Sequence, residues 1–316
     1  MLHWKRIGHI FDPTVLRPQP WMQEFAQCPT PFVLNDDVVR VIISCRPKRD
    51  SSMQYLAHPG YVDLDRHDLT RVVGVSNEPL LPLGGTGMFD EFGIMPSSVV
   101  RNGPELRMYY SGWTRMDTLP YSLAIGVARS TDGGHTFSRV GPGPTLNIGL
   151  HEPYFVTGPY VLPDDRGWQM WYLSCERWIN LNGKAEPIYR AAHASSGNGL
   201  EWRHSGDEIL EAHTLNECQD MFAPFFSHGC WHAVFAFRDP TIDYGRYRLG
   251  YAQSDDLRDW KRDDSLVGFD RSSSGWDSEM MCYPQMLEID GRQLVFYCGN
   301  QFGERGFGIA ELTDIT

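Results

Sequence analysis

A proline-marked strand recurs five times along the chain, and this repeat limits the possible folds more than any other feature. The marker prolines stand at positions 31, 96, 159, 224 and 284, so successive copies are 65, 63, 65 and 60 residues apart. Each proline opens a short apolar segment such as Pro159-Tyr160-Val161-Leu162. A near-constant period indicates a fold built from repeated supersecondary units that pack against their neighbours.

Each copy continues in the same order, with an aromatic-rich strand, a strand of small residues and a tight polar turn. In the second copy these segments are residues 108–113, 124–128 and 130–137. In the first copy we expect the small-residue strand at Met53-Gln54-Tyr55. About four short strands per copy, without helical periodicity, predict an all-β protein, a five-bladed β-propeller that forms a single domain over residues 1–316.

The sequence also indicates how the ring closes. The last copy ends after residues 309–312 without a fourth strand, and the N-terminus offers one in Trp4-Lys5-Arg6-Ile7-Gly8. We therefore expect the N-terminal strand to pair with the final blade, since this closes the ring without an open sheet edge.

Charge and cysteine content exclude several classes of partner. The chain has 28 Lys and Arg against 40 Asp and Glu, a formal net charge of −12. A nucleic-acid binder usually has a basic face, so we expect no nucleic-acid partner. No apolar run approaches the roughly 20 residues that span a bilayer, so we expect no membrane partner. Seven Cys without zinc-site spacing favour buried free thiols and a cytoplasmic location, with no metal site identified.

Acidic residues precede the marker prolines at a nearly constant offset of six or seven residues. They are Glu24, Asp90, Glu152, Glu217 and Asp277. In a propeller the loops that lead into the innermost strands gather on one rim of the central channel, so we expect these side chains to converge on one funnel. Neighbouring carboxylates raise one another's pKa, which suits a general acid beside an ionised base. Alternatively, such acids can hydrogen-bond the turn backbone and brace the blades.

Further candidates stand beside these acids and at the ends of the second strands, on the same rim. Aromatic faces pack on sugar rings, and arginine binds carboxylate or phosphate through paired hydrogen bonds. Arg–Asp pairs can also simply tie blades together. The predicted substrate-binding residues are Arg46, Glu91, Trp113, Glu176, Arg177, Glu217, Arg238, Asp239 and Asn300.

One turn resembles a known motif. Ser130-Thr131-Asp132-Gly133-Gly134-His135-Thr136-Phe137 is similar to the Asp-box of sialidases and related propellers. Glycine accepts positive φ and aspartate can hydrogen-bond its own turn, so we assign Asp132 a structural role.

The five-bladed layout, with acids before the inner strands, resembles the superfamily of family 32, 43, 62, 68 and 130 glycoside hydrolases. Four short motifs more closely resemble bacterial glycosyl-hydrolase-like proteins of surface-polysaccharide gene clusters. They are Phe89-Asp90-Glu91-Phe92-Gly93, Tyr110-Ser111-Gly112-Trp113, Trp276-Asp277-Ser278-Glu279 and Tyr297-Cys298-Gly299-Asn300.

This resemblance implies an Asp base in the first blade, an orienting Asp in the second and a Glu acid in the third. Asp90 and Glu152 fit the second and third positions, whereas the first blade has no Asp near Cys28 and has only Glu24 nearby. We therefore expect Asp277 to supply the missing group. Some relatives hold a calcium ion in the channel, and the sequence identifies no ligand set for one.

The sequence thus predicts a carbohydrate-active enzyme, a glycosidase with Asp90, Glu152 and Asp277 as catalytic residues. Its substrate would be a small-molecule sugar or oligosaccharide, and arginines would bind an acidic group on it. Two alternatives stay open: a non-catalytic sugar-binding propeller, and an enzyme that transfers or modifies sugars in glycan biosynthesis.

Overall fold

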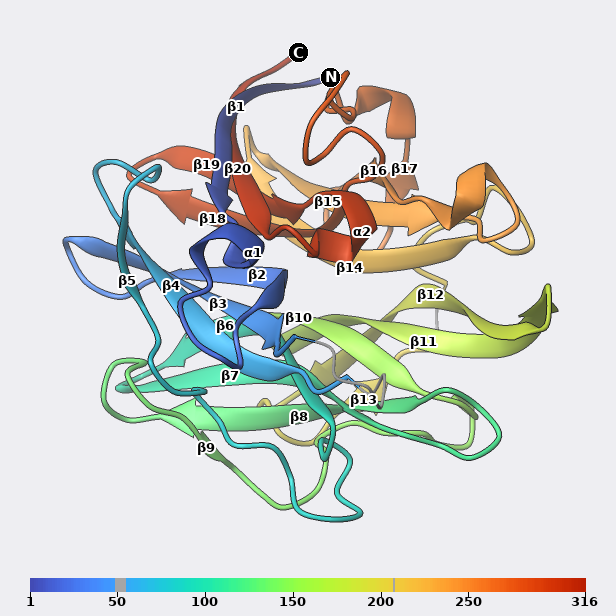
Figure 1. Cartoon of the computed structure of the whole chain (residues 1–316). Helices are drawn as coiled ribbons and strands as arrows, with labels where there is room; N and C mark the ends of the chain where they lie inside the picture. The colour runs from blue at the N-terminus through green and yellow to red at the C-terminus, as the bar shows by residue number, and fades with distance from the viewer. Residues whose placement is uncertain (49–54, 207) are drawn as a thin grey trace.

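The computed structural model describes residues 1–48, 55–206 and 208–316 and contains five four-stranded antiparallel sheets arranged around a central axis (Figure 1). This is the five-bladed β-propeller that the repeat predicts. In the first four blades the strands follow chain order from one edge of the sheet to the other. The innermost strands of the five blades are β2, β6, β10, β14 and β18, whose bounds follow.

The first two blades are regular four-stranded sheets. Blade one consists of β2 (Glu24–Val33), β3 (Val38–Arg46), β4 (His58–Asp65) and β5 (Val72–Val75). Blade two consists of β6 (Gly93–Asn102), β7 (Glu105–Thr114), β8 (Ser122–Ser130) and β9 (Ser138–Arg139).

The next two blades repeat this plan, and blade three has the longest hairpin. Blade three consists of β10 (Val156–Asp164), β11 (Gly167–Leu181), β12 (Lys184–Ser196) and β13 (Arg203–His204). Blade four consists of β14 (Cys218–Ser227), β15 (Cys230–Arg238), β16 (Arg248–Ser254) and β17 (Lys261–Arg262).

The fifth blade joins the two ends of the chain. It consists of β18 (Cys282–Ile289), β19 (Arg292–Cys298), β20 (Phe307–Ile315) and β1 (Leu2–Phe11). In the β1–β20 ladder, Trp4 lies opposite Leu312 and Arg6 opposite Ala310. Figure 1 shows the blue β1 beside the red β20, with the two termini close together. The predicted closure by the N-terminal strand is confirmed.

One predicted strand is displaced. The third strand of blade one is β4, which begins at His58, not the expected segment at 53–55. Met53 and Gln54 lie outside the described residues, and Tyr55 is not in a strand. The reason is register: all eight residues of β4 pair with β3, from His58 opposite Cys45 to Asp65 opposite Val38. Burial alternates along its second half, as expected for a strand with one face packed against the core.

Every innermost strand carries a bulge. The register shifts once or more along each of β2, β6, β10, β14 and β18. In four of them a residue at the shift has positive φ, namely Cys28, Gly158, Met221 and Tyr283. A bulge re-aims the neighbouring side chains, so it can turn a residue of a buried strand toward the axis.

Three blades share a turn between their third and fourth strands. A serine hydroxyl donates to the Asp or Asn two residues later, in the pairs Ser130–Asp132, Ser196–Asn198 and Ser254–Asp256. Asp132 also accepts from the backbone amides of His135 and Thr136. Its carboxylate is therefore used within its own turn, as its assigned structural role requires.

Helices are short. The described residues contain α1 (Pro13–Leu16), α2 (Asn300–Gly303) and the 3-10 turns η1 (Asp243–Gly245) and η2 (Asp264–Leu266). Among the described residues, no helix has the length and apolar character to cross a membrane. Buried aromatic side chains such as Trp171, Tyr109 and Phe296 fill the spaces within and between blades.

Candidate functional site

A cavity of about 560 Å³ lies at one mouth of the central channel. All five innermost strands contribute to its wall, each with one residue: Gln27, Met95, Thr157, Asp220 and Tyr283. The size is that of a small-ligand site. The cavity therefore stands where the five blades meet, at the place that the resemblance predicts for a funnel.

Blades two and three form an aromatic side of this cavity. Its lining includes Trp113, Tyr121, Phe155 and Tyr189, with Leu123 and Leu173 between them. Trp113 lies flat on β6 because residue 93 is glycine: a Cβ there would come within 1.5 Å of the indole nitrogen. Flat aromatic surfaces of this kind pack against the C–H faces of sugar rings.

The other side of the cavity is polar, and its groups are held in place. Gln27 donates through Nε2 to the Phe302 carbonyl at 2.8 Å and accepts from Arg46 at 3.0 Å. The Arg46 guanidinium also lies 4.3 Å from the Phe25 ring centre. The Thr157 hydroxyl donates to Ser111 of the neighbouring blade at 2.8 Å. These polar groups need little reorganisation to meet a ligand.

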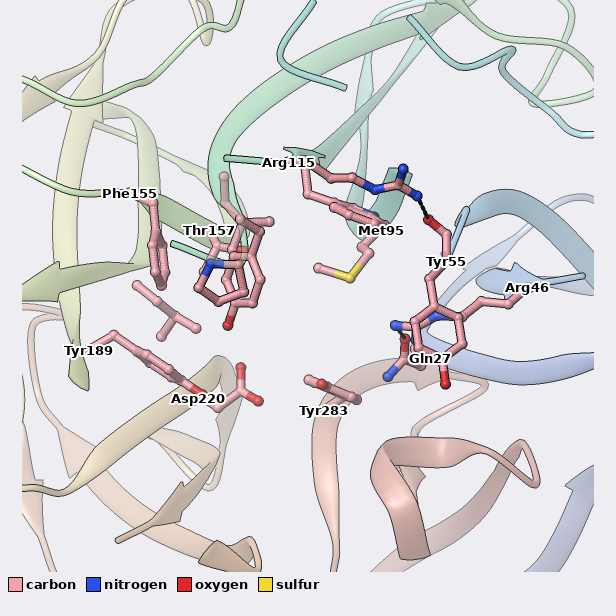
Figure 2. Close-up of a pocket in the computed structure, with 15 residues that line it drawn as sticks. Gln27, Arg46, Tyr55, Met95, Arg115, Phe155, Thr157, Tyr189, Asp220 and Tyr283 are labelled. Atoms are coloured by element: carbon pink, nitrogen blue, oxygen red, sulfur yellow. Dashed lines mark hydrogen bonds between the residues drawn. The ribbon is translucent and has the colours of Figure 1, made fainter. Parts of the chain in front are cut away.

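Arg115 adds a second positive charge to this wall. It donates to the Tyr55 carbonyl at 3.1 Å and stacks 4.0 Å from the Phe92 ring centre. Figure 2 shows Arg46 and Arg115 on the same side of the cavity, with Tyr55 between them.

Asp220 is the acidic residue of the cavity wall in the part of the chain that the structure describes. It lies on β14 directly before the bulge residue Met221, and Figure 2 shows its carboxyl group pointing into the cavity between Tyr189 and Tyr283. Burial raises the pKa of Asp220 to about 7, although the Arg238 cation and the Tyr247 hydroxyl favour its charged form. Near neutral pH this group can both give and take a proton.

The predicted catalytic residues Asp90, Glu152 and Asp277 are buried but do not line this cavity. Each accepts a hydrogen bond from a second-strand tyrosine of its own blade, at 3.0, 2.6 and 3.0 Å respectively. Each also lies against a basic residue of the outermost strand of that blade. The tyrosines are Tyr110, Tyr172 and Tyr297, and the bases are Arg139, His204 and Arg6. We call each such set of acid, tyrosine and base an acid clamp.

Blade four contains a related pair without the tyrosine. Glu217 accepts from Arg262 of β17 at 2.7 Å, and both side chains are almost fully buried. The near-constant offset thus has a structural explanation for four of the five acids, because Asp90, Glu152, Glu217 and Asp277 each tie the outermost strand of their blade to the loop before the innermost strand. The structure does not bring Asp90, Glu152 and Asp277 together in one funnel. Their catalytic role stays a prediction that this geometry does not favour.

Two of the predicted substrate-binding residues, Arg46 and Trp113, line the central cavity. Three others, Glu217, Arg238 and Asp239, line a separate cavity of about 160 Å³ in blade four. Arg238 is not an open anion receptor, because it forms a buried ion pair with Glu186 of blade three at 2.5 Å.

The remaining four contact loops on the rim. Glu91 accepts from the Gly87 amide, and Asn300 accepts from the amides of Glu279 and Met280. Glu176 pairs with Arg177, which also donates to the Leu215 carbonyl. Glu24, the remaining acid of the five, begins β2 opposite Arg46.

Sequence reasoning assigned no role to most of the cavity wall, including Gln27, Thr157 and Tyr283. Three residues of the wall nevertheless share a recognisable position in the chain. Gln27, Thr157 and Asp220 each stand directly before the positive-φ residue of an innermost strand. In blades one and three that residue precedes a proline, at Cys28-Pro29 and Gly158-Pro159, so an alignment on Pro29 instead of Pro31 finds Gln27.

The cavity does not fit the calcium ion that the resemblance allows. Calcium prefers six to eight oxygen ligands that include several carboxylates. The described wall offers one carboxylate and two guanidinium groups, and no cluster of three or more His, Cys, Asp or Glu side chains occurs in the described residues. We therefore derive no step through a metal.

The fold is that of the five-bladed propeller glycoside hydrolases. A solved structure described as "Glycoside hydrolase" superposes with a TM-score of 0.74 at 15% identity, covering 99% of this chain and 93% of that one. A thermostable family-43 glycoside hydrolase gives 0.63 at 14% identity, covering 90% of this chain and 88% of that one. The endo-arabinase from Bacteroides thetaiotaomicron gives 0.61 at 10% identity, covering 98% of each.

At the level of sequence, the chain is similar to proteins of Mycobacterium tuberculosis. It is 28% identical over 311 residues to "Uncharacterized protein Rv1502" of strain H37Rv, which covers 98% of this chain and 99% of that protein. The corresponding protein of strain CDC 1551 is also 28% identical. No protein-family model matches the chain.

Proposed function

We propose that the protein is a saccharide-processing enzyme that binds its substrate in the central cavity and uses Asp220 as its proton-transferring group. One observation carries this proposal: a carboxyl group with a pKa of about 7 points into a ligand-sized cavity with an aromatic wall. Perturbed carboxyl groups in such cavities are typical of enzyme sites. The shared fold of the propeller glycosidases supports a saccharide as substrate.

The proposed reaction is hydrolysis of a glycosidic bond with Asp220 as general acid. Its proton passes to the oxygen that leaves as the bond to the anomeric carbon breaks. A water molecule supplies the hydroxyl that replaces it, and the other proton of that water goes to the Asp220 carboxylate, which restores the acid. The pKa of Asp220 keeps about half of the molecules protonated at pH 7, so the acid form is available there. Gln27 and Thr157 would hold sugar hydroxyls, since both have fixed positions in the wall.

The aromatic side and the two arginines suggest how a sugar would be oriented. Trp113, Phe155 and Tyr189 would take the apolar face of a ring. Arg46 and Arg115 would lie toward an acidic substituent, since a guanidinium binds carboxylate or phosphate better than it binds a neutral hydroxyl. The substrate would then be an acidic sugar or an oligosaccharide that contains one.

A second candidate function is sugar binding without hydrolysis. Most glycosidases use two carboxyl groups that flank the bond, whereas the described wall provides Asp220 alone. This observation specifically favours a binding propeller over an enzyme of the usual two-carboxylate type.

A comparison of the wild-type protein with Asp220→Asn would decide between the two. Both would be incubated with neutral and acidic oligosaccharides and aryl glycosides, with released reducing ends and binding measured in parallel. The enzyme hypothesis expects a 10²- to 10⁴-fold loss of turnover in Asp220→Asn with binding retained. The matched control is Asp255→Asn, an exposed residue of the turn after β16 in the same blade, which should behave as wild type.

Wild-type binding without any released product would instead support the binding propeller. Unchanged turnover in Asp220→Asn would refute the role proposed for this residue.

A further inference from the structure

Behind Asp220 lies a buried network that the proposed reaction does not use directly. Arg238, at the end of β15, forms an ion pair with Glu186 of β12 and packs 5.2 Å from the ring centre of Tyr247. The Tyr247 hydroxyl hydrogen-bonds the Tyr189 hydroxyl on the cavity wall. The network therefore joins blades three and four at the base of the cavity.

The β14–β15 ladder brings Arg238 and Asp220 to the same face of the sheet. Asp220 lies opposite Ala236, and Cys218 lies opposite Arg238, so Asp220 and Arg238 are diagonal neighbours. Diagonal pairs across a ladder are about 7–8 Å apart, which long side chains bridge. Tyr247 lies close to both, because it packs on the Arg238 guanidinium and its hydroxyl is among the groups that favour the charged form of Asp220.

We propose that Arg238, held by Glu186, is a positioning residue that orients the Asp220 carboxyl group through Tyr247 and governs its protonation. This inference rests on the proposed function for the importance of Asp220, but the network and its effect on that carboxyl group do not depend on the substrate.

The groups that face Asp220 identify Arg238 as the residue that controls the protonation of Asp220. The thiols and phenols that interact with Asp220 are Cys28 on β2, Tyr189 on β12, Tyr247 before β16, Cys282 and Tyr283 on β18, and Cys298 on β19. Burial raises the pKa of every one of these thiols and phenols, so they are neutral near pH 7. Arg238 is the charged group acting on Asp220 in the described structure.

Glu186 weakens the effect of the Arg238 charge on Asp220. Its side chain is 26% exposed and that of Arg238 is 10% exposed, so the ion pair is shielded from solvent on the arginine side. Glu186 neutralises part of the positive charge that Asp220 experiences. Removal of Glu186 and removal of Arg238 should therefore move the titration of Asp220 in opposite directions.

The experiment measures the unfolding free energy against pH, which needs no substrate. The pKa of Asp220 is raised on folding, so its contribution to stability is full below the unfolded-state pKa and is lost as the pH rises through about 7. The difference between each protein and the same protein carrying Asp220→Asn isolates this titration. In the wild-type background the upper end of this titration, the pH above which the difference stops changing, should lie near pH 7.

In Glu186→Gln the upper end of the titration should move down by about one pH unit, a tenfold rise in the acid dissociation constant, because Arg238 is then uncompensated. In Arg238→Met it should move up by a similar amount, because the cation is lost. Arg238→Lys retains the charge without the planar guanidinium, and it should bring the upper end of the titration closer to that of the wild type than Arg238→Met does.

If Arg238→Met does not fold, Glu186→Gln and Arg238→Lys still test the proposal. An upper end of the titration that remains at the wild-type pH, or that moves in the same direction in Glu186→Gln and Arg238→Met, would overturn it. A protein that shows the opposite shifts but no turnover on any saccharide would retain the network and lose the proposed enzyme function, so the two failures are distinguishable.

Discussion

The acid clamp of blade two provides the sharpest test of whether the regularly spaced acids are structural or catalytic. Asp90 is fully buried and accepts from the Tyr110 hydroxyl at 3.0 Å and from Arg139 Nε at 2.8 Å. The side chain of Arg139 is only 16% exposed. Asp90→Asn removes the negative charge with little change of shape, and it leaves a largely buried guanidinium without its counter-charge.

Removal of one partner from a buried ion pair costs about 3–5 kcal/mol. With a urea slope of about 3 kcal/mol per molar, the upper part of the range for small proteins, the unfolding midpoint should fall by roughly 1–1.7 M. The matched control is Glu91→Gln, the neighbouring acid, whose carboxylate accepts from the Gly87 amide near the surface. Its effect should stay within about 0.5 kcal/mol.

Urea denaturation followed by tryptophan fluorescence measures both variants, and turnover per folded molecule is measured in parallel once a substrate is known. The structural explanation expects a large loss of stability and unchanged turnover of the folded fraction. A midpoint equal to that of the wild type, together with a 10²- to 10⁴-fold loss of turnover, would refute it and restore Asp90 as a catalytic residue.

Two further predictions follow from the fold. Deletion of residues 1–12 removes β1 and exposes the edge of β20, so the truncated protein should aggregate or melt at a much lower temperature. Size-exclusion chromatography and a melting curve check this, and a monomer with an unchanged melting temperature would contradict closure by β1. All seven cysteines are free, and six of them are buried. Alkylation of the denatured protein without reductant should therefore add seven groups by mass, whereas pairwise losses would indicate disulfides and argue against the expected cytoplasmic location.

The architecture could be predicted because the sequence contains the pattern of one blade several times. Each blade repeats the same strand pattern, so an error in one copy, such as the displaced third strand of blade one, leaves the other four to define the fold. The closing strand was predictable for a related reason, since the last copy lacks one strand and the N-terminus supplies one.

The site was less predictable because its residues do not repeat. Gln27, Thr157 and Asp220 occupy equivalent places before a bulge but belong to three different chemical types. The acids at constant spacing were the more visible pattern, and their regularity reflects a structural task shared by the blades. Asp220, the proposed proton-transferring residue, occurs once, inside an apolar strand, where the backbone geometry distinguishes it from its neighbours.

Ring closure also has a consequence for how the protein folds during synthesis. β1 begins at Leu2 and its partner β20 begins at Phe307, so the strand of the propeller that is synthesised first pairs with the one that is synthesised last. Blades one to four each consist of consecutive strands and can form as they emerge. Throughout that time β1 has an unpaired edge, and pairing between the β1 and β20 strands of different molecules would make the same hydrogen bonds as closure within one molecule. When several ribosomes translate one mRNA close together, domain-swapped molecules that exchange β1 would therefore be favoured. Dilution or slower translation initiation would favour the closed monomer.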